Sequence, residues 1–126
     1  MQLEGMGLFV DDMPAMVKFY RDVMGFSIEN DNTIIIQDGI LFMLYPRKDF
    51  EAFASQAFEY VGSINGHFEI SLKVENFAKV DETYNEVVAK GAKSIVAPVT
   101  CPWGQRTCFV SDPEGNIIEI SSFNEG

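Results

Sequence analysis

The chain has 126 residues, of which 47% are hydrophobic and 22% are charged, a composition typical of one globular domain and not of a disordered chain. Nine Lys and Arg residues against nineteen Asp and Glu residues give a formal net charge of −10. This charge repels phosphate backbones and anionic lipid surfaces, which argues against nucleic-acid and membrane partners.

Targeting signals and disulfide patterns are missing from the sequence. We expect no membrane span, because the apolar stretches are short, and no signal peptide, because the start lacks basic residues and an apolar run. The two cysteines, Cys101 and Cys108, are too few for a disulfide framework and form no CxxC motif. A cytoplasmic location with reduced thiols is therefore expected.

The first half of the chain predicts a strand, a helix and three short strands. Residues 3–10 have strand character, and apolar residues recur at helical spacing over residues 13–24. Asp12 and Pro14 suit the start of this helix, and Gly25 suits its end. Short strands are expected next over residues 26–29, 33–37 and 40–45.

The second half repeats this order after a less regular connector over residues 47–65. Residues 67–74 alternate polar and apolar, which predicts a strand with one wet and one dry face. A helix capped by Asn76 should follow and end at Gly91. Three more strands are expected over residues 93–96, 105–111 and 117–123, with turn residues at 112–116.

The two halves also align in sequence. Leu8 and Tyr20 of the first half match Leu72 and Tyr84 of the second half. An internal duplication is therefore predicted, with modules over about residues 1–46 and 66–126 and a connector over residues 47–65.

Three blocks of sequence carry a resemblance to a known family. The blocks run from Val10 to Phe26, from Pro102 to Gly104 and from Asp112 to Ile120. They resemble the vicinal oxygen chelate superfamily, which includes glyoxalase I, bleomycin-resistance proteins and extradiol dioxygenases. The resemblance implies an α+β fold in which two tandem βαβββ modules form a curled mixed sheet around a cleft. It also implies one glyoxalase-like domain over residues 1–126 and a homodimer.

Metal-dependent members of this family hold a divalent ion with one side chain from each of four strands. The resemblance places Gly5, Met43, Glu69 and Glu119 at these positions, and the first two offer no ligand for a hard metal. Glu69 stands where a histidine is usual. The single histidine, His67, is two residues away and is expected on the same strand face, so these two residues and Glu119 are the alternative metal set. We therefore expect no cofactor, and a divalent metal ion is the alternative.

Glu69 and Glu119 are the candidate catalytic residues. Two carboxyl groups facing a shared cleft raise each other's pKa when they are close, which suits a general base or a proton-sharing pair. The competing interpretation is a solvated or hydrogen-bonded cleft wall. For His67 the competing interpretation is a surface histidine at a strand edge.

Side-chain alternation predicts a cleft with one polar and one apolar wall, typical of a pocket for a small organic ligand. Gly5 and Gly7 are expected to open room in it, and Trp103 and Arg106 to close over a ligand by stacking or by pairing with an anion. The alternatives are interior packing for the apolar wall and local loop packing for the last two. The other candidate ligand-binding residues are His67, Ser71, Lys73 and Ser121 on the polar wall, and Phe9, Met43 and Tyr45 on the apolar wall.

Three hypotheses about function follow. The favoured one is a homodimeric protein that binds a small, partly apolar organic ligand without a metal, and whether it catalyses a reaction is left open. The second is a metal-dependent lyase, isomerase or dioxygenase, of the type often named lactoylglutathione lyase. The third is a binding module or inert relative whose cleft is closed.

Overall fold

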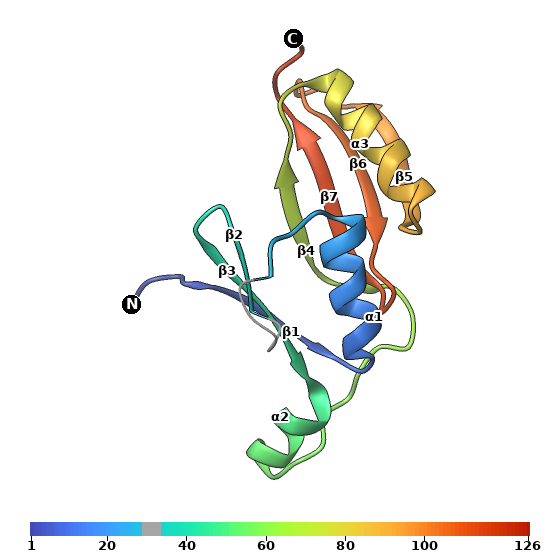
Figure 1. Ribbon diagram of the computed structural model, residues 1–126. Helices are drawn as coiled ribbons and strands as arrows, with labels where there is room; N and C mark the ends of the chain where they lie inside the picture. Colours follow the sequence, from blue (N-terminus) through green and yellow to red (C-terminus); the bar gives the residue numbers. More distant parts are fainter. Residues whose placement is uncertain (29–33) are drawn as a thin grey trace. The chain divides into compact units, whose positions relative to one another are not determined.

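The computed structural model describes residues 1–28 and 34–126, which form two compact units, Met1–Tyr60 and Val61–Gly126 (Figure 1). The boundary between the units falls inside the connector expected over residues 47–65. Each unit has its own sheet and its own buried apolar residues. Within the described ranges, no helix is long and apolar enough to cross a membrane.

The first unit contains a three-stranded sheet in the order β1-β3-β2, with β1 parallel to β3 and β2 antiparallel to it. Met6, Leu8 and Val10 alternate with Gly5, Gly7 and Phe9, so the two sets lie on opposite faces of β1. Its elements are β1 (Gly5–Val10), α1 (Met13–Lys18), η1 (Phe19–Val23), β2 (Ile34–Gln37), β3 (Ile40–Pro46) and α2 (Arg47–Ala54).

The helix expected over residues 13–24 is present, but its second part is a π-helix. Asp12 caps α1 as predicted, since its side chain accepts a hydrogen bond from the Ala15 backbone N–H at 3.0 Å. Gly25 follows the helical segment with φ +77°, a conformation that favours glycine. In η1 the ring of Tyr20 is fully buried, with its centroid 4.9 Å from that of Phe42.

The remaining predictions for the first unit are confirmed in part. Ile28 forms a single bridge, and residue 29 of the strand expected over 26–29 lies outside the described residues. Residue 33 also lies outside them, and β2 begins at Ile34. In the connector, the phenylalanines at 50, 53 and 58 indicate a short helix or a packed loop, and the structure has the eight-residue helix α2 at its start.

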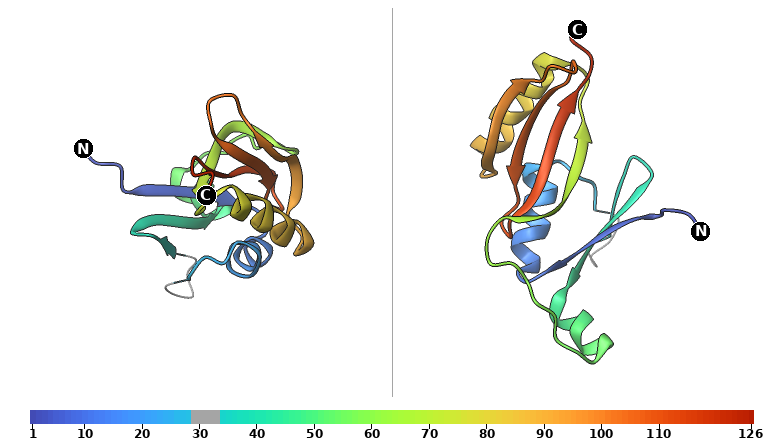
Figure 2. Two further views of the ribbon diagram at one scale, coloured as in Figure 1. Left: turned by 90° about the horizontal axis from the view of Figure 1, so that it is seen from above. Right: turned by 180° about the vertical axis from the view of Figure 1, so that it is seen from behind.

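The second unit is a βαβββ module with a four-stranded mixed sheet, as predicted. The strand order is β4-β7-β6-β5, with β4 parallel to β7 and the other pairs antiparallel. In the view from behind, the four strands lie in front of α3, so the helix covers one face of this sheet (Figure 2). The elements are β4 (Asn65–Lys73), α3 (Phe77–Ala89), β5 (Lys93–Thr100), β6 (Arg106–Ser111) and β7 (Asn116–Ser122).

Local signals fix the ends of the elements in this unit. Asn76 caps α3 by accepting a hydrogen bond from the Lys79 backbone N–H at 2.9 Å, as predicted. Asp112 is buried in the turn before β7, where its carboxylate accepts backbone N–H bonds from Glu114 at 2.9 Å and Asn116 at 3.0 Å. A buried carboxylate with these bonds holds the turn in one conformation and sets where β7 begins.

Candidate ligand groove on the second sheet

Alternation along β4, β7 and β6 divides the second sheet into a face covered by α3 and an opposite face, the open face. Cys108, Val110, Ile118 and Ile120 are buried on the α3 face. On the open face, the strand register aligns the residues in three rows. The rows are Glu69, Ile117 and Ser111; Ser71, Glu119 and Phe109; and Lys73, Ser121 and Thr107.

Glu119 is the buried carboxylate of the open face, with 8% of its surface exposed. The Thr107 hydroxyl donates a hydrogen bond to Glu119 Oε2 at 2.7 Å, and the Ser71 hydroxyl donates one to Oε1 at 3.3 Å. These two bonds offset the cost of removing the carboxylate from water. Neighbouring strands on both sides therefore hold Glu119 in place.

Glu69 lies next to Glu119, as the sequence suggested. Partial burial of the Glu69 carboxyl raises its pKa first, and the nearby negative charge of Glu119 raises it further. A protonated Glu69 can donate a hydrogen bond to Glu119, which raises the pKa in the same direction. The two carboxyl groups can therefore share one proton.

An open groove of about 430 Å³ lies beside this carboxyl pair. Its apolar residues include Phe109 and Ile117 of the open face, and its one ionisable lining residue is Glu69. A mostly apolar cavity with a few polar groups at its edge suits a small organic molecule. The groove is lined by Gly66, Phe68, Glu69, Ile95, Val96, Phe109 and Ile117.

Ser111 is a second polar residue of the open face. It is 1% exposed, and its hydroxyl has no hydrogen-bond partner among the residues that the structure describes. It lies directly opposite Ile117, which lines the groove. Buried polar atoms are almost always bonded, so this hydroxyl is an exception that needs a reason.

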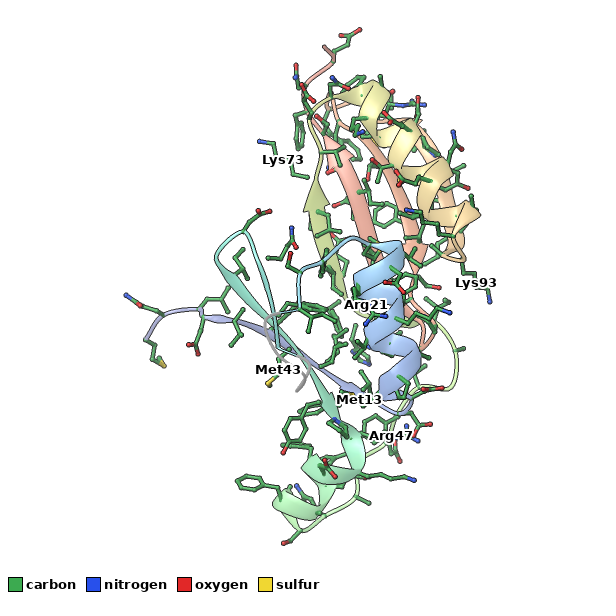
Figure 3. All side chains as sticks on the ribbon, in the orientation of Figure 1. Met13, Arg21, Met43, Arg47, Lys73 and Lys93 are labelled. Atoms are coloured by element: carbon green, nitrogen blue, oxygen red, sulfur yellow. The ribbon has the colours of Figure 1, made fainter. Side chains whose placement is uncertain are left out.

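Several of the residues predicted to form the site lie on this face, and others were missed. Ser71 and Ser121 occupy its rows, and Lys73 is exposed and projects from the β4 edge of the sheet (Figure 3). Thr107 and Ser111 were not predicted. The alternation of residues 106–111 indicated that these two side chains share a face. The sequence alone did not give the register of β6 against β7, which places them beside Glu119 and Ile117.

The strand pairing is irregular at His67, so side-chain alternation alone does not place it on the face of Glu69. The pairing of β4 with β7 is irregular between Asn65 and Glu69, and the His67 backbone N–H bonds to the Asn65 side chain at 3.1 Å. Among residues 1–28 and 34–126, no three His, Cys, Asp or Glu side chains are close enough to hold one metal ion. His67, Glu69 and Glu119 thus do not fit a metal centre, which usually needs three protein ligands.

Arg106 and Trp103 are not among the residues that line the groove. Arg106 begins β6 on the α3 side, where it pairs with Asp81 of α3 at 2.8 Å and donates to the Thr100 hydroxyl at 2.9 Å. The structure therefore shows the local pairing of Arg106, which was the alternative to anion binding. Trp103 is 67% exposed, and its indole N–H donates to the Gln105 side chain at 2.9 Å.

The aromatic side chains of the predicted apolar wall pack on one another in the first unit, and Phe9 keeps 45% of its surface exposed. Phe9 stacks on Phe50 of α2 at 4.2 Å and meets Tyr45 edge-on at 6.4 Å. Gly5 does not open room, because a Cβ atom there would fall on the backbone carbonyl oxygen of Leu41. Met43, which Figure 3 labels on β3, reaches to 3.3 Å from the position of a Cβ on Gly7.

Comparisons with known proteins agree with this fold. The family model described as Glyoxalase/Bleomycin resistance protein/Dioxygenase superfamily matches residues 2–120. An uncharacterised protein of Bacillus subtilis, YraH, is 29% identical to this chain, covering 95% of it and 97% of that protein. Virulence protein STM3117 of Salmonella typhimurium is 26% identical, covering 97% of this chain and 84% of its own.

A solved structure supports the same assignment at the level of the fold. It is a glyoxalase/bleomycin resistance protein/dioxygenase family enzyme from Burkholderia phytofirmans, with a TM-score of 0.82 and 24% identity. The match covers 96% of this chain and 98% of that one. The chain therefore belongs to the glyoxalase/bleomycin resistance protein/dioxygenase superfamily.

Proposed function

We propose that this protein binds a small, partly apolar organic molecule in the groove of the second sheet, without a resident metal ion. The observation that supports this proposal is the apolar groove of about 430 Å³ beside the Glu69 and Glu119 carboxyl pair. Its volume lies in the range of roughly 300–1,000 Å³ that is usual for small-molecule sites. The apolar lining supplies affinity, and the carboxyl pair orients the ligand.

A screen of metabolites and antibiotics by thermal shift tests this function, with two tryptophan variants to locate the site. Val96 lines the groove and is 40% exposed, whereas Val99 lies on the same strand outside the lining and is 45% exposed. Val96→Trp should fill the groove and remove the shifts, and Val99→Trp should leave them unchanged. The proposal fails if no compound shifts the wild type, or if the compounds still bind to Val96→Trp.

A metal-dependent lyase, isomerase or dioxygenase is the second candidate. The observation that favours it is the adjacency of two hard oxygen ligands, Glu69 and Glu119. Titration of chelator-treated, untagged protein with Ni²⁺, Zn²⁺, Mn²⁺ and Fe²⁺ by calorimetry tests it. Stoichiometric binding that is lost in Glu119→Gln would support this candidate over the first.

The assembly implied by the family resemblance is part of the proposal. We propose a homodimer of single glyoxalase-like domains whose two modules curl around a cleft. Light scattering on purified protein should give twice the chain mass of 14.1 kDa. A monomer at micromolar concentration would contradict the homodimer.

A further inference from the structure

No ion pair formed among residues 1–28 and 34–126 includes a carboxyl group of the open-face pair. The ion pairs formed among the described residues join other side chains, and none reaches Glu69 or Glu119. Lys73, the cation in the rows of this face, is exposed and projects away from the sheet (Figure 3). The pair is thus a local concentration of negative charge without an ion-pair partner among the described residues.

Glu119 also keeps acceptor capacity for a ligand. A carboxylate offers about four acceptor sites, and the hydroxyls of Thr107 and Ser71 use one on each oxygen. Glu69 is exposed at the edge of the groove, so a molecule in the groove can reach it. What this site accepts best is a group that donates hydrogen bonds and carries positive charge.

Ser111 is a second polar residue in the row of Glu69, and it does not line the groove. Its hydroxyl is buried without a partner among the described residues, and it lies in the row that contains Ile117 and Glu69. Two strand spacings separate Ser111 from Glu69, which is about 10 Å.

We propose that the ligand carries a protonated amine that lies against Glu69 and Glu119 while its apolar part occupies the groove. This inference rests on the function proposed above. The net charge of −10 favours a cationic ligand over an anionic one, because the field of the whole chain acts in the same direction as the pair.

Three probes with one shared apolar body test the charge preference by calorimetry at pH 7. They are 4-phenylbutylamine, 4-phenylbutan-1-ol and 4-phenylbutyrate. The amine should bind about tenfold more tightly than the alcohol, since hydrogen bonds to charged groups are the stronger ones, and the carboxylate should bind most weakly. Glu69→Gln should remove the preference for the amine and leave the affinity for the alcohol within about twofold.

Glu75→Gln is the matched control, because Glu75 is an exposed carboxylate just beyond β4 and does not line the groove. It should leave all three affinities unchanged. Because Glu69 is exposed, Glu69→Gln should fold normally, and Glu119→Gln is the second variant, with the same expected loss.

Equal binding of amine and alcohol, both lost in Val96→Trp, would overturn the charged ligand and leave the proposed function standing. The inference is also overturned if the amine does not bind to the wild type, while the compound screen decides the proposed function separately. A divalent metal that binds stoichiometrically and is lost in Glu69→Gln, with no preference for the amine, would overturn it as well.

Discussion

Replacing Thr107 by Val removes one hydroxyl from the buried carboxylate of the open face and nearly preserves the side-chain shape. The lost bond is 2.7 Å long and ends on Glu119, which is 8% exposed, so water cannot readily replace it. Hydrogen bonds to charged groups are worth about 1.5–3 kcal/mol, and we expect the free energy of unfolding to fall by that amount. The longer Ser71 bond, at 3.3 Å, remains.

Urea denaturation followed by the fluorescence of Trp103, the single tryptophan, measures this loss in the unit that contains the change. Thr100→Val is the control, because it also removes a hydroxyl that bonds to a charged group, Arg106 at 2.9 Å, but at an exposed position where water can replace the bond. It should cost less than about 0.5 kcal/mol. Combining Thr107→Val with Glu119→Gln should reveal a coupling of about 1 kcal/mol, since the Gln side chain has no charge. If Thr107→Val lowers the free energy of unfolding equally in the wild type and in Glu119→Gln, the role given to this hydrogen bond is refuted.

Three further predictions concern single residues. Folding raises the pKa of Glu69, so the folded chain holds more protons than the unfolded chain, and stability should fall as the pH rises above the ordinary pKa of 4.5. In thermal melts, the melting temperature of Glu69→Gln should therefore rise relative to that of the wild type between pH 4 and pH 7. A difference in melting temperature that stays constant with pH would contradict this. Ser111→Ala should raise the free energy of unfolding by about 1 kcal/mol, because it removes a buried hydroxyl without a partner, and a loss in denaturation would show that the hydroxyl is bonded. Burial raises the pKa of Cys108 to about 11. A thiol reagent at pH 8 should therefore label Cys101 in the native protein and label Cys108 only after denaturation. Rapid labelling of both cysteines in the native protein would be inconsistent with the burial of Cys108.

Elements with strong local signals were predictable from the sequence. The cap residue Asn76 and the apolar stripe after it define α3, and Asp12 and Gly25 do the same for the first helical segment. The π-helix η1 escaped prediction because the apolar spacing over residues 13–24 fits an ordinary helix equally well. Both units begin with a strand, a helical segment and further strands, which is the repeated order that indicated a duplication.

The site was predictable where strand alternation holds and not where it breaks. Glu69 and Glu119 were placed together correctly because both lie in regular parts of their strands. Alternation could not place His67, because the pairing of β4 with β7 is irregular between Asn65 and Glu69. The sequence left the pairing of Arg106 open, because its partner, Asp81, comes from a helix that is distant in sequence.

The irregular pairing of β4 also has a consequence for how relatives of this protein diverge. Gly66 and Phe68 line the groove from a stretch that lies between the paired residues Asn65 and Glu69. Insertions or replacements there can reshape the groove without shifting the rows that hold Glu69 and Glu119. Short insertions or substitutions in this stretch can therefore change the ligand preference while Glu69 and Glu119 keep their positions.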